Sequence, residues 1–434
     1  PLSQRRYYST SINRNFTPDL SFPNILNYGL EQESQENQAQ NKNKPDFIDQ
    51  LDQFLADSDL PIKTDKVPNK FTKLHSIGCG FSKDDDPMKK IEPENFCITP
   101  NMKSRSYGED AAFIFEGQDA DVLALSDGVG GWRNWGVDPA EFSSSLMRNM
   151  QEILEAAEQQ QETTQTTHFK NQKQPLFRVD QPVQLLTQAF NQLTNQPSLV
   201  GSGTACLASF SKTTGKLYTA NLGDSGFLVI RNNKVVHKSI PQCHYFNAPY
   251  QLSIKSADFL NSEIGSRFQS KALTDGPDKA DFDEFQCESG DIIILASDGM
   301  FDNVHEEQVN LMLERLEVSL EKAKSDEKTA LGNLFESGYE SPRISNSSDR
   351  SEDDSGYFQD DTTSKSKNKC ISPNLNPMLE RATSTLVSFA RMNAYNNRYL
   401  SPFAMEARRE GHVNYVGGKV DDITILISVV GDMV

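Results

Sequence analysis

The sequence has few of the residues that build nitrogen- and sulfur-ligated metal sites. Its 434 residues include 6 cysteines, 6 histidines and 2 tryptophans. The cysteines are scattered and form no Cys-x-x-Cys pair, which argues against a zinc site or a disulfide framework and suits a reducing compartment. The histidines form no cluster either. The cysteines and histidines therefore predict neither a zinc site nor a disulfide framework.

The sequence also lacks a long hydrophobic run and an excess of positive charge. No apolar stretch approaches the roughly 18 residues that cross a bilayer, so we expect no transmembrane segment. Hydrophobic residues make up 36% of the chain, a low share, so part of it is expected to lie outside the folded core. The net charge of −18 argues against binding to nucleic acids or anionic membranes.

Composition divides the chain into segments. The first 16 residues contain arginines and hydroxyl residues but no acid. Residues 1–30 are therefore interpreted as the remnant of a mitochondrial transit peptide, with an ordinary basic terminus as the alternative. Residues 31–70 are predicted to be a disordered polar linker. The folded domain is expected over residues 71–434, with polar insertions at about 159–176 and 325–376.

Three common phosphoryl-transfer sites are missing. A cysteine phosphatase needs an arginine six residues after its cysteine, and none of the 6 cysteines has one. A P-loop ends in Lys followed by Ser or Thr, and the nearest match, residues 201–204 (GSGT), lacks the lysine. An aspartyl-phosphate enzyme needs Asp-x-Asp directly after its first strand, whereas Asp119 and Asp121 precede theirs.

The sequence does contain acids at the ends of strand-like segments. Residues 122–132 (VLALSDGVGGW) are an apolar run that ends in Asp127 and glycines, and residues 291–299 (DIIILASDG) repeat this plan. Two acidic pairs instead precede apolar runs: Glu109-Asp110 and Asp421-Asp422. In antiparallel sheets these two strand ends and two strand starts meet at one edge. We then expect at least four carboxylates there, with no cation supplied by the protein, and hence a bound cation.

An all-oxygen site of this kind selects Mg²⁺ or Mn²⁺ over zinc or copper. Two such ions bridged by a carboxylate activate a water and neutralise phosphate charge. Asp127 is the best candidate for the bridge, because a glycine carbonyl follows it. Arg105 lies five residues before Asp110, near enough to clamp a phosphate group.

Hydrophobic periodicity predicts elements that are clustered rather than alternating. A helix is expected to start at Pro139, capped by Asp138, and to end near residue 159. Further helices are expected at 183–195, 305–322 and 377–394, and strands at 71–82, 110–127, 203–210, 216–222, 226–231, 234–238, 291–299 and 422–430. Residues 240–285 are expected to be an irregular flap. This order favours an α+β layered sandwich with an antiparallel sheet pair.

These residues together resemble the type 2C, metal-dependent Ser/Thr protein phosphatases, over about residues 71–430 without the two insertions. The resemblance is carried by Arg105, Glu109-Asp110, Asp127-Gly128-Val129-Gly130-Gly131, Gly203-Thr204, Gly223-Asp224-Ser225, Ser297-Asp298-Gly299 and Asp421-Asp422, in this order. The segments DGVGGW (residues 127–132) and SDGMFDNV (residues 297–304) resemble those of the family branch found in the mitochondrial matrix and linked to coenzyme Q biosynthesis. The resemblance implies a four-layer αββα sandwich, with two antiparallel sheets flanked by helices and metals at one sheet edge.

The resemblance also implies a role for each acid. Two Mg²⁺ or Mn²⁺ ions are expected, with a weaker third. The implied ligands are Asp127 as the bridge and the carbonyl of Gly128 for one ion, Asp298 and Asp421 for the other, and Asp224 with Asp298 for the third. Glu109 and Asp110 match acids that hold the waters around the ions, and Arg105 matches the phosphate-binding arginine. Whether Asp421 or Asp422 contacts the ion stays open.

One position departs from the family. Most members have a histidine, a proposed general acid, where this chain has Val129, and valine cannot donate a proton. Either a water protonates the leaving group or the enzyme turns over more slowly. The predicted function is hydrolysis of phosphoserine and phosphothreonine in mitochondrial matrix proteins by a monomer. The alternative is a pseudophosphatase that binds phosphoproteins, and a metal-dependent nuclease is opposed by the negative charge.

Overall fold

The computed structural model describes residues 72–92, 96–166, 176–261, 273–314 and 375–432. All of them belong to one compact unit, Asp57–Val434. The predictions for residues 1–70 and for most of the two insertions therefore lie outside the described residues.

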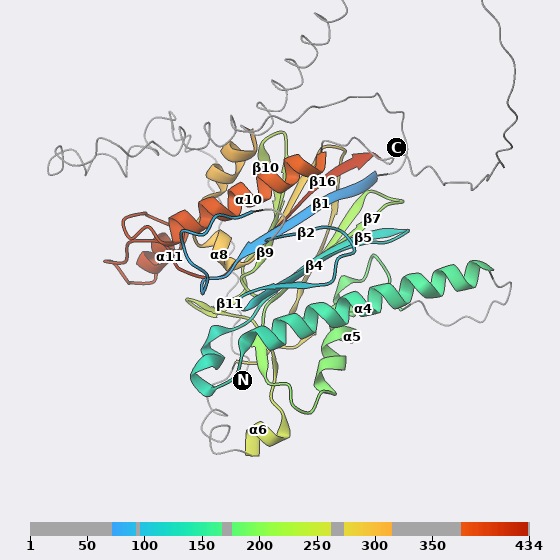
Figure 1. Ribbon diagram of the computed structural model, residues 1–434, viewed down its shortest axis with the longest axis horizontal. Helices are drawn as coiled ribbons and strands as arrows, with labels where there is room; N and C mark the ends of the chain where they lie inside the picture. The colour runs from blue at the N-terminus through green and yellow to red at the C-terminus, as the bar shows by residue number, and fades with distance from the viewer. Residues whose placement is uncertain (1–71, 93–95, 167–175, 262–272, 315–374, 433–434) are drawn as a thin grey trace, which may run out of the picture. The chain divides into compact units, whose positions relative to one another are not determined.

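Two six-stranded sheets form the centre of this unit (Figure 1). The first has the strand order β10 (Lys234–Lys238), β9 (Gly226–Arg231), β15 (Ile292–Ala296), β16 (Ile423–Asp432), β1 (Thr72–Phe81) and β2 (Cys97–Ile98). The second has the order β14 (Asp281–Gln286), β8 (Lys216–Leu222), β7 (Ala205–Ser211), β5 (Ala120–Asp127), β4 (Asp110–Glu116) and β3 (Arg105–Tyr107). Every pairing within these two sheets is antiparallel.

Residues 122–125 of strand β5 are apolar at every position rather than alternating with polar residues. Leu123 and Leu125 join the core between the two sheets. Val122 and Ala124 point the other way, into the core under the helices. A strand covered on both faces needs apolar residues at successive positions, so the run of residues 122–125 follows from its place in the middle layers.

Helices cover the outer faces of both sheets (Figure 1). Helices α4 (Pro139–Thr166) and α5 (Pro182–Thr194) pack on the second sheet, and α10 (Leu375–Ala394) packs on β1 and β16 of the first. The core beneath α4 contains residues predicted for its apolar face: Phe142, Leu146, Met150, Ile153. The predicted fold class, an α+β sandwich of two antiparallel sheets flanked by helices, is confirmed.

Helix α4 begins as expected but is longer. The Asp138 carboxylate accepts a hydrogen bond from the Ala140 N–H at 3.0 Å, and Pro139 is the first helical residue. The predicted end near residue 159 is wrong, because the helix continues to Thr166. Gln and Glu are good helix formers, and extending an existing helix costs no new nucleus.

Three other predictions need adjustment. The predicted helix at 305–322 is helical over 306–314, and its remainder lies outside the described residues. The 240–285 region is not wholly irregular: it contains α6 (Ala257–Asn261), η2 (Pro277–Lys279) and the strands β11 (Cys243–Tyr245), β12 (Ala248–Pro249), β13 (Leu252–Ile254) and β14. Helix α11 (Pro402–Arg409) was not predicted, although Ser401 caps it and proline begins it.

The four predicted strand ends do meet at one edge of the sandwich. Strand β4 begins at Asp110, directly opposite Asp127 at the end of β5. Asp298 follows β15 as the first residue of the short helix α8 (Asp298–Phe301). Asp422 directly precedes β16. Antiparallel pairing therefore joins Asp110 to Asp127 in one sheet and brings Asp298 near Asp422 in the other.

Candidate active site

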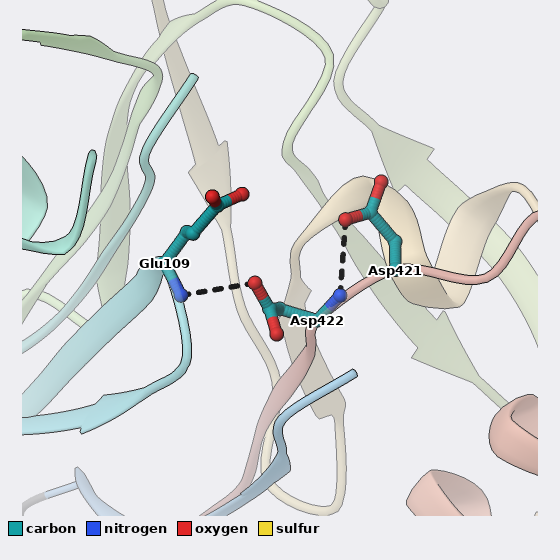
Figure 2. A group of neighbouring side chains, drawn as sticks. All are labelled: Glu109, Asp421 and Asp422. Carbon is teal, nitrogen blue, oxygen red and sulfur yellow. Dashed lines mark hydrogen bonds between the residues drawn. The ribbon is translucent and has the colours of Figure 1, made fainter. Parts of the chain in front are cut away.

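Six acids form two clusters at this edge. In the first, carboxylate oxygens of Glu109, Asp421 and Asp422 lie within 4.8 Å of one another. Figure 2 shows these three side chains converging from two separate segments of the chain. The second cluster brings oxygens of Asp127, Asp224 and Asp298 together within the same limit. Asp224 reaches it from the turn that joins β8 to β9.

Burial and like charge make Asp110, Asp127 and Asp224 hard to ionise without a cation. Burial and the neighbouring Asp422 raise the pKa of Asp110 well above its usual range. Burial and the neighbouring Asp298 likewise raise the pKa values of Asp127 and Asp224. Such shifts are typical of carboxylates that a cation would satisfy.

Several carboxylate oxygens in the site are also without a hydrogen-bond donor. Among the described residues, none donates within hydrogen-bonding distance to either oxygen of Asp110, to Oδ1 of Asp224 or to Oδ1 of Asp298. Buried oxygens are normally hydrogen-bonded, so this is a costly arrangement for the protein alone. An all-oxygen donor set with unsatisfied atoms fits hard cations such as Mg²⁺ and Mn²⁺.

The expectation that the protein supplies no cation here is wrong. The Lys83 ammonium lies 2.6 Å from Glu109, 2.9 Å from Asp421 and 3.3 Å from Asp422. The Lys419 ammonium contacts Asp298 and lies 3.2 Å from Asp421. Both lysines come from polar loop sequence, which has no pattern that predicts where a flexible side chain ends.

The lysines change the electrostatics of the cluster. Burial alone would lower the pKa of Lys419, but Asp298, Asp302 and Asp421 raise it well above its usual range. Burial would also raise the pKa of Asp421, but Lys419 and Lys83 lower it overall. The two lysines therefore stabilise the charged form of Asp421.

Asp302 is a member of the site that the sequence analysis missed. Its carboxylate accepts a hydrogen bond from Lys419 at 2.8 Å, and burial raises its pKa to about 7 against the opposing effect of that lysine. The sequence did contain a pattern that could have indicated Asp302: it lies four residues after Asp298, the spacing that places two residues on one face of a helix.

The two adjacent acids Asp421 and Asp422 have different surroundings. Asp422 is 1% exposed and accepts backbone hydrogen bonds from Glu109 at 2.9 Å and from Lys83 at 2.8 Å. Figure 2 shows the first of these bonds. The Ser82 hydroxyl donates to it as well, at 3.2 Å. The hydrogen bonds of the Asp422 carboxylate thus hold two loops in place. The Asp421 carboxylate instead lies beside the ammonium groups of Lys83 and Lys419.

Gly128 lies where no side chain fits. A Cβ there would come within 2.5 Å of the Pro139 carbonyl oxygen and 2.8 Å of the Glu109 carbonyl oxygen. The next residue, Val129, packs with Trp135 against the small core of Trp132 and Val200. The position at which the family resemblance implies a histidine therefore belongs to a hydrophobic cluster around Trp132.

Arg105 lies beside the acid clusters rather than within them. It lines a groove of about 540 Å³, together with Ser82, Tyr107 and Gly108. Its Nη1 donates to the Cys97 carbonyl at 3.1 Å. Ser82 links the groove to the acids through Asp422. A second arginine was not predicted: Arg133 contacts Glu109, and it donates to Asp84 at 2.9 Å.

Comparison with known families defines the class of this protein. The sequence model of the protein phosphatase 2C family matches residues 100–336. The chain belongs to this family, and it is a metal-dependent protein serine/threonine phosphatase that acts on phosphoproteins. The family uses Mg²⁺ or Mn²⁺. Within the part of the chain that the structure describes, no helix is both long and apolar enough to cross a membrane.

Individual proteins are similar to this chain over most of its length. The chain is 34% identical over 360 residues to the protein phosphatase PTC7 homolog of Xenopus laevis, covering 83% of this chain and 90% of that protein. The human PTC7 homolog is 33% identical over 360 residues, with 83% and 88% covered. Among solved structures, the photosystem II phosphatase PBCP is 26% identical with a TM-score of 0.47, covering 75% of this chain and 93% of that one. The catalytic domain of the phosphatase PstP with two manganese ions is 12% identical with a TM-score of 0.36, covering 83% and 100%.

Proposed function

We propose that this protein hydrolyses phosphoserine and phosphothreonine with two divalent cations held at the sheet edge. The observation that supports this most is the convergence of two groups of three carboxylates, each within 4.8 Å. When bound, the ions activate a water for attack on phosphorus and neutralise the charge of the phosphate group. All of the predicted acids lie in or beside these two clusters.

The chain's residues divide into ion ligands and residues that orient them. We assign Asp127 as the bridge, the Gly128 carbonyl to one ion and Asp298 with Asp421 to the other. Asp421 is preferred to Asp422 as the ligand because Asp422 already accepts hydrogen bonds from two backbone groups. Asp224, beside Asp127 and Asp298, is assigned to a weaker third ion.

The remaining residues act on the water and the substrate. Glu109 and Asp110 are placed to orient waters, because their carboxylates are buried beside the proposed ligands. Arg105 would bind the phosphate group from the adjoining groove, where its guanidinium can form paired hydrogen bonds to two oxygens. A pseudophosphatase is the less favoured reading, because no acid of the predicted set is missing.

The cellular setting is part of the same proposal. The likeness to PTC7 homologs and the arginine-rich, acid-free N-terminus together support the mitochondrial matrix as its location. Substrates would then be mitochondrial phosphoproteins, including proteins of coenzyme Q biosynthesis. We propose that it acts as a monomer.

Hydrolysis of a phosphothreonine peptide tests the catalytic proposal directly. We expect release of phosphate with Mn²⁺, no release with EDTA, and recovery when excess Mn²⁺ is restored. Binding of the peptide without any hydrolysis under all three conditions would instead identify a phosphoprotein-binding module.

Val129→His tests the missing proton donor. A serine leaving group needs a proton far more than an acidic phenol does. We expect the variant to hydrolyse phosphopeptides faster while its rate on aryl phosphates changes little. The measurement is rate against leaving-group pKa in both proteins at saturating Mn²⁺. Equal slopes would mean that a water already serves as the acid.

Lys419→Met tests how the lysine affects ion binding. Removing a positive charge that contacts Asp298 and Asp421 should lower the apparent Kd for Mn²⁺ by at least about tenfold. The variant should also melt at a lower temperature in EDTA, because its acids lose their counter-ion, and gain more from Mn²⁺ than the native protein does.

Lys212→Met is the matched control, since Lys212 pairs with Asp121 at 2.9 Å at the opposite end of β5. It should lower the melting temperature by the same amount with and without Mn²⁺. Weaker Mn²⁺ binding in Lys419→Met would show that the lysine orients the ligands rather than competing with the ion.

A further inference from the structure

Two cysteines face each other on neighbouring strands. Cys79 of β1 and Cys97 of β2 are direct partners in an antiparallel register. Both are free thiols, and they are 0% and 8% exposed. Directly opposite residues in antiparallel strands project from the same face of the sheet. None of the other described cysteines has a cysteine as its strand partner.

The pairing affects the protonation of Cys79. A hydrogen bond with Cys97, followed by burial, raises the pKa of Cys79 well above its usual range. Cys79 therefore keeps its proton, and the strand register places its side chain beside that of Cys97.

The backbone geometry suits a disulfide after a small movement. Directly opposite residues have Cβ atoms about 4.5–5.5 Å apart, whereas a disulfide needs about 3.5–4.5 Å. The strands must therefore approach by about 1 Å at this pair. Strand β2 has only two residues and lies at the edge of its sheet, so its displacement disturbs few hydrogen bonds.

We propose that Cys79 and Cys97 are a redox modification site, which hydrogen peroxide converts to an intramolecular disulfide. The Cys97 sulfur, nearer the exposed edge, attacks one peroxide oxygen, the O–O bond breaks, and a sulfenic acid and water form. The Cys79 sulfur then attacks the Cys97 sulfur and breaks its S–O bond. The Cys79 proton leaves with the hydroxyl group as a second water. Two thiols and one peroxide thus give one disulfide and two waters.

The disulfide would act on the substrate groove through the backbone of β2. The Cys97 carbonyl accepts the hydrogen bond from Arg105 at 3.1 Å, and the neighbouring Phe96 carbonyl accepts one from the Tyr107 hydroxyl at 2.6 Å. Arg105, Phe96 and Tyr107 all line the groove. Drawing β2 toward β1 moves both carbonyls and so displaces the guanidinium. This consequence rests on the proposed role of Arg105 in phosphate binding.

Peptide mapping of the native protein tests the modification without any assay of activity. The full chain is treated with hydrogen peroxide, its remaining thiols are alkylated, and it is digested without reduction. We expect one cross-linked peptide that joins Cys79 to Cys97, has lost two hydrogen atoms and disappears with dithiothreitol. Unlinked Cys79 and Cys97 in a sample whose exposed Cys243 has been oxidised would overturn the proposal.

Kinetics tests the consequence separately. In a Cys243→Ser, Cys370→Ser background, peroxide should raise the KM for an aryl phosphate by about tenfold, the scale of one charged hydrogen bond, with kcat little changed. Adding Cys97→Ala should remove this response. A cross-link with unchanged KM would overturn the link to Arg105, and inactivity of the untreated protein would instead count against the proposed function.

Discussion

Replacing Asp127 by asparagine is expected to reduce turnover by several orders of magnitude while the protein stays folded. Asp127 shares its cluster with Asp224 and Asp298, and its carboxylate is the proposed bridge between two ions. Asparagine keeps the size of the side chain but removes the charge that holds both cations, a loss on the scale of several kcal/mol.

Unlike its turnover, the thermal stability of the metal-free Asp127→Asn variant should not fall. Because burial and Asp298 raise the pKa of Asp127 in the folded protein, its ionised form destabilises the metal-free fold at neutral pH. Asp127→Asn should therefore melt at the same or a higher temperature than the native protein in EDTA. It should also lose most of the stabilisation that Mn²⁺ gives.

Asp121→Asn is the control for a buried carboxylate outside the site. Asp121 lies at the other end of β5, pairs with Lys212 at 2.9 Å and accepts the Leu74 N–H at 2.9 Å. Its replacement should lower stability but leave the Mn²⁺ dependence of the rate intact. Near-normal Mn²⁺-dependent activity in Asp127→Asn would contradict the two-metal mechanism.

Gly128→Ala is expected to damage both the fold and the metal site, although it adds only one methyl group. The new methyl group would meet the Pro139 and Glu109 carbonyl oxygens at 2.5 and 2.8 Å, and both are backbone atoms that cannot rotate away. The loop must shift, and with it the carbonyl proposed to contact an ion. We expect a loss of about 1–3 kcal/mol in unfolding free energy and a large fall in metal-dependent turnover.

Gly131→Ala, three residues further on in the 3-10 helix η1 (Gly130–Trp135), is the matched control. The nearest atom to its new methyl group would be a Val129 methyl carbon at 4.0 Å, an ordinary contact. Thermal melts and kcat at saturating Mn²⁺ should separate the two variants clearly. If both behave alike, the close approach at Gly128 does not decide the geometry of the site.

Much of the site could be predicted because strand ends are marked in the sequence. An apolar run ends at Asp127 and another at Asp298, while Asp110 and Asp422 begin theirs. Antiparallel pairing then requires these ends to meet. The fold class followed from the same runs, since strands covered on both faces must be apolar at successive positions.

Helix boundaries and side-chain reach were less predictable. The polar end of α4 looked like a loop because glutamine and threonine carry no apolar period, yet the helix continues through them. Lys83 and Lys419 were not recognised as parts of the site. Their long side chains can point in many directions, and only the position of the acids across the fold selects one.

Strand ends and residue chemistry are local properties, so the sequence was enough to predict most of the acids at this sheet edge, although it missed Asp302. The partners that each residue meets there depend on the packing of the whole fold. Glu109 and Asp422 are 313 residues apart, yet one hydrogen bond joins them, and register alone places Cys79 opposite Cys97. The first contact depends on how the two sheets pack on each other, and a one-residue change of register between β1 and β2 would remove the second.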